Sequence, residues 1–458
     1  MEKNNLVENK MGTMPVLKLI FNMSLPIMFS MLVMALYNIV DSIFVGQISD
    51  EALTAVSLAF PIQNLMVSFA IGTSVGVNAL LSLRLGQRRQ DDVNKTAMNG
   101  VFLAIVTWIV FAIVGLFCAS SYVKSQTENP LIIELAEEYL GVILIFGFGL
   151  FCETMFERLL QATGRTFFSM ISQLLGAVFN IIFDPLLIFG IGFFPEMGIK
   201  GAALATVLGQ IFACLVSIVL NLKKNHDIQF SIKNIIPHGA IIVQIYKVAI
   251  PAILMSSITS VITYFLNLIF KGIPNGGDDA ITVYGIYFKL NSFIFMPVFG
   301  LNNGIIPIIA YNLGANHRKR ITTAIKYALL IAFIIMSFGV LLFEVVPQIL
   351  LGLFTQTPKL IEMGTVALRV IAPSFLGAAV AITFSSIFQA LGNAIYSLIV
   401  SFSRQVIVFL PAAYLLGRTG NIDNVWWCFL IAECMSVGMS LFLMRRIYKK
   451  KISLMPKE

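Results

Sequence analysis

The chain has few charged residues. Of its 458 residues only 12% are charged while 58% are hydrophobic, and the mean hydropathy is +0.89. A soluble domain carries about 25% charged residues, so this composition excludes an ordinary soluble domain. The charges fall in short islands between apolar blocks of about twenty residues or more, the length that crosses about 30 Å of hydrocarbon. The composition therefore predicts an all-α polytopic membrane protein.

Other absences narrow the function. The chain has three His and five Cys, and no two Cys form a CxxC pair, so we expect no metal site, no disulfide framework and no cofactor. No Gly-x4-Gly-Lys-Ser/Thr phosphate loop is present, so ATP is not expected to be the direct energy source. The apolar blocks lack the short alternation of a membrane β-barrel. The basic residues are scattered over many loops, which disfavours a nucleic-acid partner.

The apolar blocks predict twelve membrane spans. A polar segment at 223–242 reads as a cytoplasmic linker between an N-terminal six-helix lobe, residues 1–222, and a C-terminal six-helix lobe, residues 243–458. The expected spans cover residues 17–46, 53–82, 96–118, 131–155, 159–192, 199–222, 243–271, 280–312, 322–348, 358–385, 389–417 and 424–446.

The two predicted lobes repeat one another in sequence. Leu85-Gly86 recurs as Leu313-Gly314, and QATG at 161–164 recurs as QALG at 389–392, each pair 228 residues apart. Because each copy has an even number of spans, both copies enter the membrane in the same direction. We therefore expect two six-helix bundles related by a pseudo-twofold axis along the membrane normal.

The distribution of positive charge predicts the orientation in the membrane. Of the 31 Lys and Arg residues, 23 fall on the side that holds both termini and five fall on the other side. The positive-inside rule then places both termini in the cytoplasm. Anionic lipid headgroups are the expected partner of these basic loops.

Two aspartates lie inside predicted spans. Asp41 interrupts the stretch LYNIVDSIFVG at 36–46, and Asp184 lies in the fifth span. A carboxylate at the centre of a membrane helix costs about 2.5–3.5 kcal/mol on the insertion scale, so its presence calls for a function. The repeat has Asn267 and Ala412 at the corresponding positions of the second lobe. Acids kept in one lobe only favour an ion-coupling site, although structural hydrogen bonding between helices remains the alternative.

Local spacing around the two acids supports a shared site. Asn180 and Asp184 are four residues apart and share a helix face, and Pro185 leaves a backbone carbonyl without its helical partner. Asn38 lies on the same face of the first span as Asp41. Burial favours the protonated form of a carboxyl group, and two acids in one site favour it further. The pattern predicts binding of a proton or another small cation.

Several segments resemble a known transporter family. The stretches LYNIVDSIFVG (36–46), LLSLRLGQ (80–87), QATGRTFFSMISQLLGAVFNIIFDPLLIFG (161–190) and MGIKGAALAT (197–206) resemble the multidrug and toxic compound extrusion (MATE) transporters, and among them the MepA-like and DinF-like branch. The resemblance extends over essentially all twelve spans.

The resemblance implies a bacterial cell-membrane antiporter, without enzyme activity, that exports amphipathic, usually cationic, drugs in exchange for protons or sodium by alternating access. It also implies a monomer and a role in antibiotic resistance. Carried over residue by residue, the cation-coupling residues of this branch are Asp41, Asn180, Asp184 and Thr206.

Other polar residues and two prolines are candidates for further roles. Glu157 either pairs with Arg158 or lines the cavity, and Glu433 either pairs with Arg404 or Lys289 or contacts a proton or drug. The candidate substrate-cavity residues are Asn38, Glu157, Asn302, Asn303 and Glu433, and the candidate hinges are Pro26 and Pro185.

Two alternative functions compete with drug antiport. An exporter or flippase of a lipid-linked or polysaccharide precursor would need cationic residues in its cavity, whereas we expect no Lys or Arg in the membrane-embedded part of the first lobe's spans, since Lys18, Arg165 and Lys200 fall toward span ends. An intramembrane aspartyl protease would need a GxGD stretch, and neither Asp41 nor Asp184 lies in one. The first observation favours a cationic cargo, and the second disfavours the protease.

Overall fold

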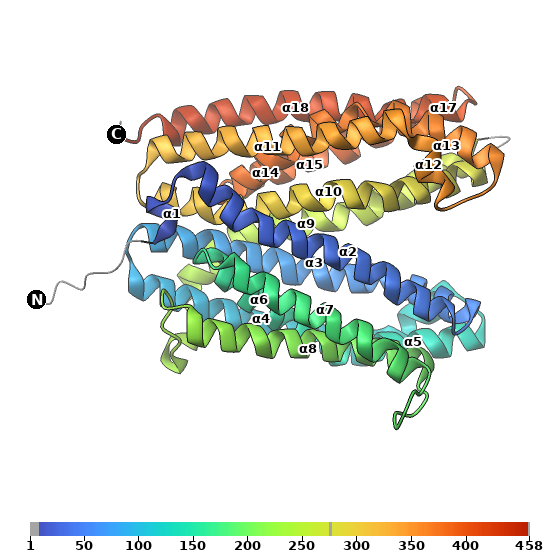
Figure 1. Cartoon of the computed structure of the whole chain (residues 1–458), viewed down its shortest axis with the longest axis horizontal. Helices are drawn as coiled ribbons and strands as arrows, with labels where there is room; N and C mark the ends of the chain where they lie inside the picture. Colours follow the sequence, from blue (N-terminus) through green and yellow to red (C-terminus); the bar gives the residue numbers. More distant parts are fainter. Residues whose placement is uncertain (1–8, 274–276, 457–458) are drawn as a thin grey trace, which may run out of the picture. The chain divides into compact units, whose positions relative to one another are not determined.

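The computed structural model describes residues 9–273 and 277–456, and within these ranges it is helical and contains no strand (Figure 1). The long helices follow the apolar blocks, because a backbone in lipid must satisfy its own hydrogen bonds. The helices are α1 (Lys10–Thr13), α2 (Val16–Gly46), α3 (Asp50–Gly86), α4 (Gln90–Gln126), α5 (Pro130–Ile145), α6 (Phe148–Ala162), α7 (Thr166–Ile188), α8 (Gly198–Lys224), η1 (Ile232–Ile235), α9 (Gly239–Lys271), α10 (Gly277–Gly314), α11 (Arg318–Val345), α12 (Pro347–Gly352), α13 (Pro358–Ile371), α14 (Ser374–Ala390), α15 (Ala394–Phe402), η2 (Ser403–Phe409), α16 (Leu410–Gly417), α17 (Ile422–Val425), α18 (Trp427–Ile447) and η3 (Tyr448–Ile452).

The helices account for the twelve predicted spans. Among the described residues, ten helical stretches are long and apolar enough to cross a membrane. Two further pairs, α5 with α6 and α13 with α14, pass the same test together and are bent by 42° and 52°. Counting each bent pair as one span gives twelve, so the prediction of an all-α polytopic membrane protein is confirmed.

The predicted end of the fourth span is wrong, and the observed end places Arg158 inside a helix. The fourth span was expected to end near residue 155, but α6 continues to Ala162 and the next helix begins only at Thr166. Gly164 has a φ of 84°, and this left-handed turn separates the two helices. Arg158 therefore lies inside a helix of the first half and is only 7% exposed, so the expectation of no Lys or Arg within those spans is incorrect.

The sequence repeat is reproduced in the local geometry of the turns. Arg88 and Asn316, which are 228 residues apart, both have a φ of 59° although neither is glycine. Gly164 and Gly392 have the same separation and φ values of 84° and 71°. Left-handed conformations at matching positions are uncommon enough to indicate that both halves follow one structural plan.

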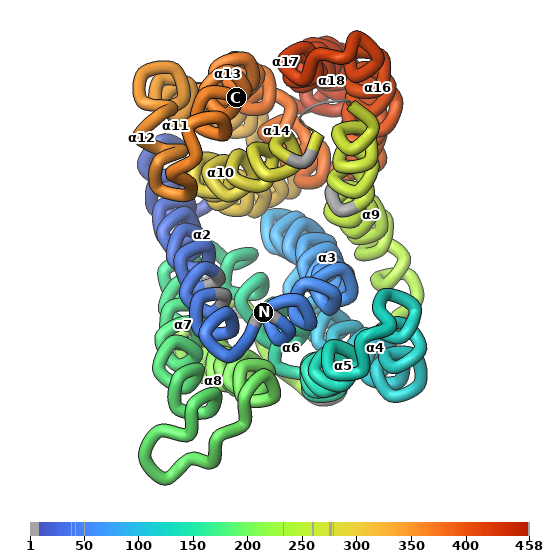
Figure 2. The backbone as a smooth tube through the Cα atoms, turned by 90° about the vertical axis from the view of Figure 1, so that its right-hand side faces the viewer, coloured from blue at the N-terminus to red at the C-terminus, as the bar shows by residue number. Residues whose placement is uncertain are grey.

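The chain forms two compact units. The first contains the N-terminal residues through Thr13 together with Phe29–Ile253, and the second combines Met14–Met28 with the residues from Leu254 onward. Helices α2 and α9 therefore each begin in one unit and end in the other. Figure 2 looks along the helices, and within the first unit it shows α7 beside α8 and α4 beside α5. The predicted lobe limits at residues 222 and 243 stay a prediction.

The predicted linker is held against the first unit by two asparagines of α4. The Asn94 side-chain oxygen accepts from the backbone N–H of Gln229 at 2.9 Å, and that of Asn99 accepts from the backbone N–H of His238 at 2.8 Å. Both asparagines are buried. These bonds satisfy backbone groups in a segment that has little regular structure.

Paired glycines allow close helix contacts in both units. In the first unit, a Cβ atom at Gly76 of α3 would lie 2.5 Å from the carbonyl oxygen of Ile245 in α9. In the second unit, a Cβ atom at Gly300 of α10 would lie 2.5 Å from the Cα of Met28 in α2. Gly76 and Gly304, and likewise Gly72 and Gly300, are 228 residues apart. Small residues at four-residue spacing let membrane helices approach closely, and here the repeat uses them twice.

We expect alanine to have opposite effects at two glycines of α10. Gly300→Ala forces its new methyl group against the Met28 backbone, and overpacking of this kind costs about 1–3 kcal/mol. Gly285→Ala is the matched control, because nothing lies within 4 Å of its Cβ position and helical alanine gains about 0.5–1 kcal/mol over glycine. Thermal unfolding in detergent should show a lower midpoint for Gly300→Ala and an unchanged or higher one for Gly285→Ala. Equal midpoints would contradict the close contact.

Candidate functional site

Two carboxyl groups meet inside the first unit. Asp41 comes from α2 and Asp184 from α7, and their side chains lie within hydrogen-bond reach of each other. Asp184 is fully buried, and the Oδ1 atom of Asp41 is buried without a hydrogen-bond donor. Two carboxylates in a medium of low dielectric repel each other strongly. The geometry therefore suits a site that holds a proton or a small cation between them.

Asn180 links the acid pair to helix α8. It lies one turn before Asp184 on α7, with its Nδ2 atom 3.3 Å from the Asp184 carboxylate. With the amide turned over, its nitrogen donates to Asp184 at 3.0 Å and its oxygen accepts from the backbone N–H of Thr206 at 3.2 Å. We favour this second orientation, because it satisfies both amide groups. The four residues predicted for cation coupling thus lie together.

The close approach of α7 and α8 depends on glycine. A Cβ atom at Gly209 of α8 would lie 3.1 Å from the carbonyl oxygen of Gly176 and 3.2 Å from the Cβ of Asn180. A larger residue at Gly209 would push α8 away from Asn180 and lengthen the hydrogen bond to Thr206. The local sequence therefore sets the position of the amide beside the acid pair.

Two tyrosines near the acid pair were missed by the sequence analysis. Tyr37 of α2 and Tyr139 of α5 both interact electrostatically with Asp41 and Asp184. The Tyr139 hydroxyl donates to the side-chain oxygen of Gln63 in α3 at 3.5 Å. Tyr37 carried a signal, since it precedes Asp41 by one helical turn. The sequence carries no signal for Tyr139 or Gln63, because only folding brings α3 and α5 close to the Asp41 and Asp184 pair.

Glu157 of α6 is buried and hydrogen-bonded to α7. Its carboxylate accepts from the Ser172 hydroxyl at 3.0 Å and from the Gln173 amide at 2.6 Å. Arg158 instead donates to Gln161 at 3.0 Å. Neighbouring residues on a helix point in different directions, and no ion pair joins Glu157 and Arg158 in the described part of the chain. The structure therefore does not have the predicted pairing of Glu157 with Arg158. The other predicted role of Glu157, lining the cavity, stays a prediction.

A second acid lies one turn before Glu157 on the same helix. Glu153 interacts electrostatically with Glu157, and it also interacts with Tyr37 near the Asp41 and Asp184 pair. The polar groups of α6 therefore extend toward the acid pair within the first unit. The sequence analysis did not single out Glu153, since one more acid near a predicted span end carries no signal of its own.

Glu433 of the second unit is neutralised by an arginine. Arg404 lies in the π-helical turn η2 and contacts the Glu433 carboxylate at 2.6 Å, while the Ser436 hydroxyl donates to the other carboxylate oxygen at 2.7 Å. Of the candidate partners, Lys289 instead lies over the ring of Phe354, 5.9 Å from its centroid. The structure therefore has the pairing with Arg404.

The remaining candidate residues are placed but not assigned a role. Asn302 is 3% exposed, and among the described residues neither its side-chain oxygen nor its nitrogen has a hydrogen-bond partner. Asn303 is half-buried, and the side chain of Asn38 lies outside the described part of the structure. Pro26 lies within α2, and Pro185 lies near the end of α7, where its carbonyl accepts from the N–H of Phe189. Their roles stay predictions.

All five cysteines are free, and no three His, Cys, Asp or Glu side chains in residues 9–273 and 277–456 are grouped to hold a metal ion.

A buried acid pair in a chain with up to twelve spans is typical of a membrane transporter. The MatE family model matches residues 26–186 and 251–415, which is one segment in each half of the chain. The chain belongs to the MATE family of membrane transporters, as its sequence predicts.

Similar proteins cover nearly the whole chain. The "Multidrug export protein MepA" of Staphylococcus haemolyticus (strain JCSC1435) is 27% identical over 438 residues, covering 93% of each chain. The protein of the same name from Staphylococcus aureus (strain MSSA476) is 28% identical over 420 residues, covering 92% of this chain and 91% of that one. A crystal structure of MATE in the straight conformation matches with a TM-score of 0.90 at 25% identity, covering 97% of this chain and 98% of that one.

Proposed function

We propose that the protein is a cation-coupled antiporter that exports amphipathic, mostly cationic drugs or toxic compounds from bacteria by alternating access. The observation that carries this proposal is the Asp41 and Asp184 pair, two buried carboxyl groups within hydrogen-bond reach. The names of the MepA relatives support the cargo class. An acid pair disfavours an anionic lipid-linked precursor as the cargo, despite the buried Arg158.

The mechanism we propose is a shift between two conformational states that a cation biases. A proton or sodium ion binds between Asp41 and Asp184 from outside, repacks α2 and α7 around Pro26 and Pro185, and displaces the drug. Release of the ion to the cytoplasm readmits drug. Exchange of one proton or sodium ion for one drug cation moves no net charge, so a roughly fiftyfold ion gradient, worth about 2.3 kcal/mol, sustains roughly a fiftyfold drug gradient. The orientation with both termini in the cytoplasm belongs to this proposal.

The proposal is tested with everted membrane vesicles that contain the full chain and a fluorescent cationic dye. We expect dye uptake when an inward-acidic pH gradient or an inward-high sodium gradient is imposed, and the gradient that works identifies the coupling ion. Uptake should not need ATP. Uptake that required ATP in the absence of both gradients would refute antiport, and vesicles from cells without the protein provide the baseline.

A further inference from the structure

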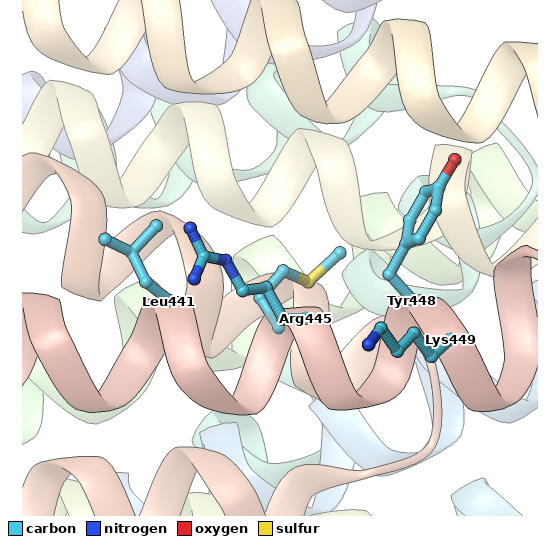
Figure 3. Close-up of a pocket in the computed structure, with 5 residues that line it drawn as sticks. Leu441, Arg445, Tyr448 and Lys449 are labelled. Atoms are coloured by element: carbon cyan, nitrogen blue, oxygen red, sulfur yellow. The ribbon is translucent and has the colours of Figure 1, made fainter.

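A hollow of about 240 Å³ lies beside the end of helix α18, in the second unit. Its walls combine apolar and cationic side chains, and Figure 3 shows them along one stretch of the helix. Almost all of the lining surface is apolar, so Arg445 and Lys449 line the hollow mainly with their aliphatic stems. The residues that line the hollow are Leu441, Met444, Arg445, Tyr448 and Lys449.

The two cationic residues have no counterion in the described chain. Arg445 and Lys449 are four residues apart, both are exposed, and no ion pair to either is present in residues 9–273 and 277–456. Like charges at this spacing repel and destabilise a helix. No acidic residue lines the hollow. An anion bound between the two side chains would remove this repulsion, so the charges favour an anionic ligand.

A neighbouring helix fixes one wall of the hollow. Arg318, the first residue of α11, donates to the Tyr448 hydroxyl at 3.3 Å and stacks over its ring at 5.9 Å from the centroid. The same guanidinium donates to the backbone carbonyl of Ser453 at 3.3 Å. Tyr448 is therefore held in place, and a third cationic group lies directly behind it. The site is thus partly built before any ligand binds.

The apolar side of the hollow continues onto a surface suited to lipid. Leu441 is 42% exposed and Phe442 is 66% exposed, and both belong to a helical stretch apolar enough to cross a membrane. In a membrane helix, exposed apolar side chains face acyl chains, and basic residues at the helix end lie at headgroup level. A free anion would use the charges but not this apolar surface.

We propose that this hollow binds an anionic phospholipid, whose phosphate lies between Arg445 and Lys449 and whose first acyl segment lies against Leu441 and Met444. The inference goes beyond the proposed transport function and does not depend on which ion drives it. The predicted orientation adds only that the lipid belongs to the cytoplasmic leaflet. Basic residues at the end of a span attract anionic lipid in this way.

The test is native mass spectrometry of the purified full chain in detergent, titrated with dioleoyl phosphatidylglycerol or dioleoyl phosphatidylcholine. The wild type should bind the anionic lipid more tightly. Arg445→Gln with Lys449→Gln should weaken that binding about thirtyfold, as expected for the loss of two cations at headgroup level, and should leave phosphatidylcholine binding unchanged. Both side chains are exposed, so the thermal midpoint should be unaffected.

The matched control removes the same charge from the same helix end. Arg446 and Lys450 are also exposed but do not line the hollow, so Arg446→Gln with Lys450→Gln removes no direct contact with the phosphate and should weaken lipid binding clearly less than the first double variant does. Equal losses in the two double variants, or no preference for the anionic lipid in the wild type, would overturn the site. Glycerol phosphate that bound as tightly as the lipid would also overturn it. If the first double variant unfolds, Lys449→Gln alone decides the question by the same comparison.

Discussion

Asp184→Asn should collapse the drug gradient while leaving the protein folded. Asparagine has nearly the same shape as aspartate but cannot take up and release a proton or balance the charge of a sodium ion. Without coupling, the roughly fiftyfold drug gradient that a fiftyfold ion gradient sustains should disappear. The measurement is steady-state dye accumulation in everted vesicles under a fixed gradient. Asp41→Asn should have the same effect, because the two carboxyl groups form one site.

A stability measurement separates lost coupling from lost folding. Asp184 is fully buried beside a second acid, so its neutral replacement removes a like-charge repulsion and should keep or raise the thermal midpoint. The matched control is Asp91→Asn, which removes a carboxylate that is 75% exposed and paired with Lys95, and should transport like the wild type. A wild-type gradient in both Asp41→Asn and Asp184→Asn would refute the coupling site and leave the family assignment intact.

The acid pair was predictable because charge in a membrane span is costly and rare. Asp41 and Asp184 stood out on that ground alone, and the four-residue spacing added Asn180. Thr206 was predicted only from the family resemblance. In the structure its backbone N–H donates to the turned side-chain amide of Asn180, which contacts Asp184. Tyr139 was not predictable, since the chain has 12 Tyr and 38 Phe and no periodicity marks which of them face a polar group.

The sequence marks one of the two helix breaks inside predicted spans and gives no sign of the other. The break between α13 and α14 coincides with Pro373, which disrupts a helix by removing a backbone donor. The break between α5 and α6 falls at Phe146 and Gly147, inside a continuous apolar run. The hydropathy of this run does not indicate a bend, although α5 and α6 meet at an angle of 42°. The membership of α2 and α9 in both units was equally invisible, because the sequence suggested a division in a polar segment.

The two units treat their buried acids differently. The first unit brings Asp41 and Asp184 together with amide and hydroxyl groups nearby. The second unit pairs Glu433 with Arg404, and its counterpart of Asp41 is Asn267. A carboxylate already held by an arginine has little free energy to gain from a mobile cation. This difference supports coupling through the first unit and predicts a structural role for the ion pair of the second.

Arg404→Leu should therefore be among the most destabilising single changes in the second unit. The Arg404 side chain is 23% exposed and that of Glu433 is 10% exposed, so removing the arginine leaves a nearly buried carboxylate without its counterion. Breaking a buried ion pair in this way costs about 3–5 kcal/mol. Thermal unfolding in detergent should show a large fall in the midpoint. Lys359→Leu is the matched control, because the Lys359 and Asp279 pair has the same 2.6 Å distance but side chains that are 67% and 32% exposed.

The double variant Arg404→Leu with Glu433→Leu removes both charges of this ion pair. When both charges are replaced by apolar groups, the desolvation cost disappears with the attraction, so most of the lost stability should return. Breaking the exposed control pair should cost less than about 1 kcal/mol. If Glu433 carried the coupled cation, the double variant would recover stability but not transport. We expect recovery of both, because the proposed cation site lies in the first unit.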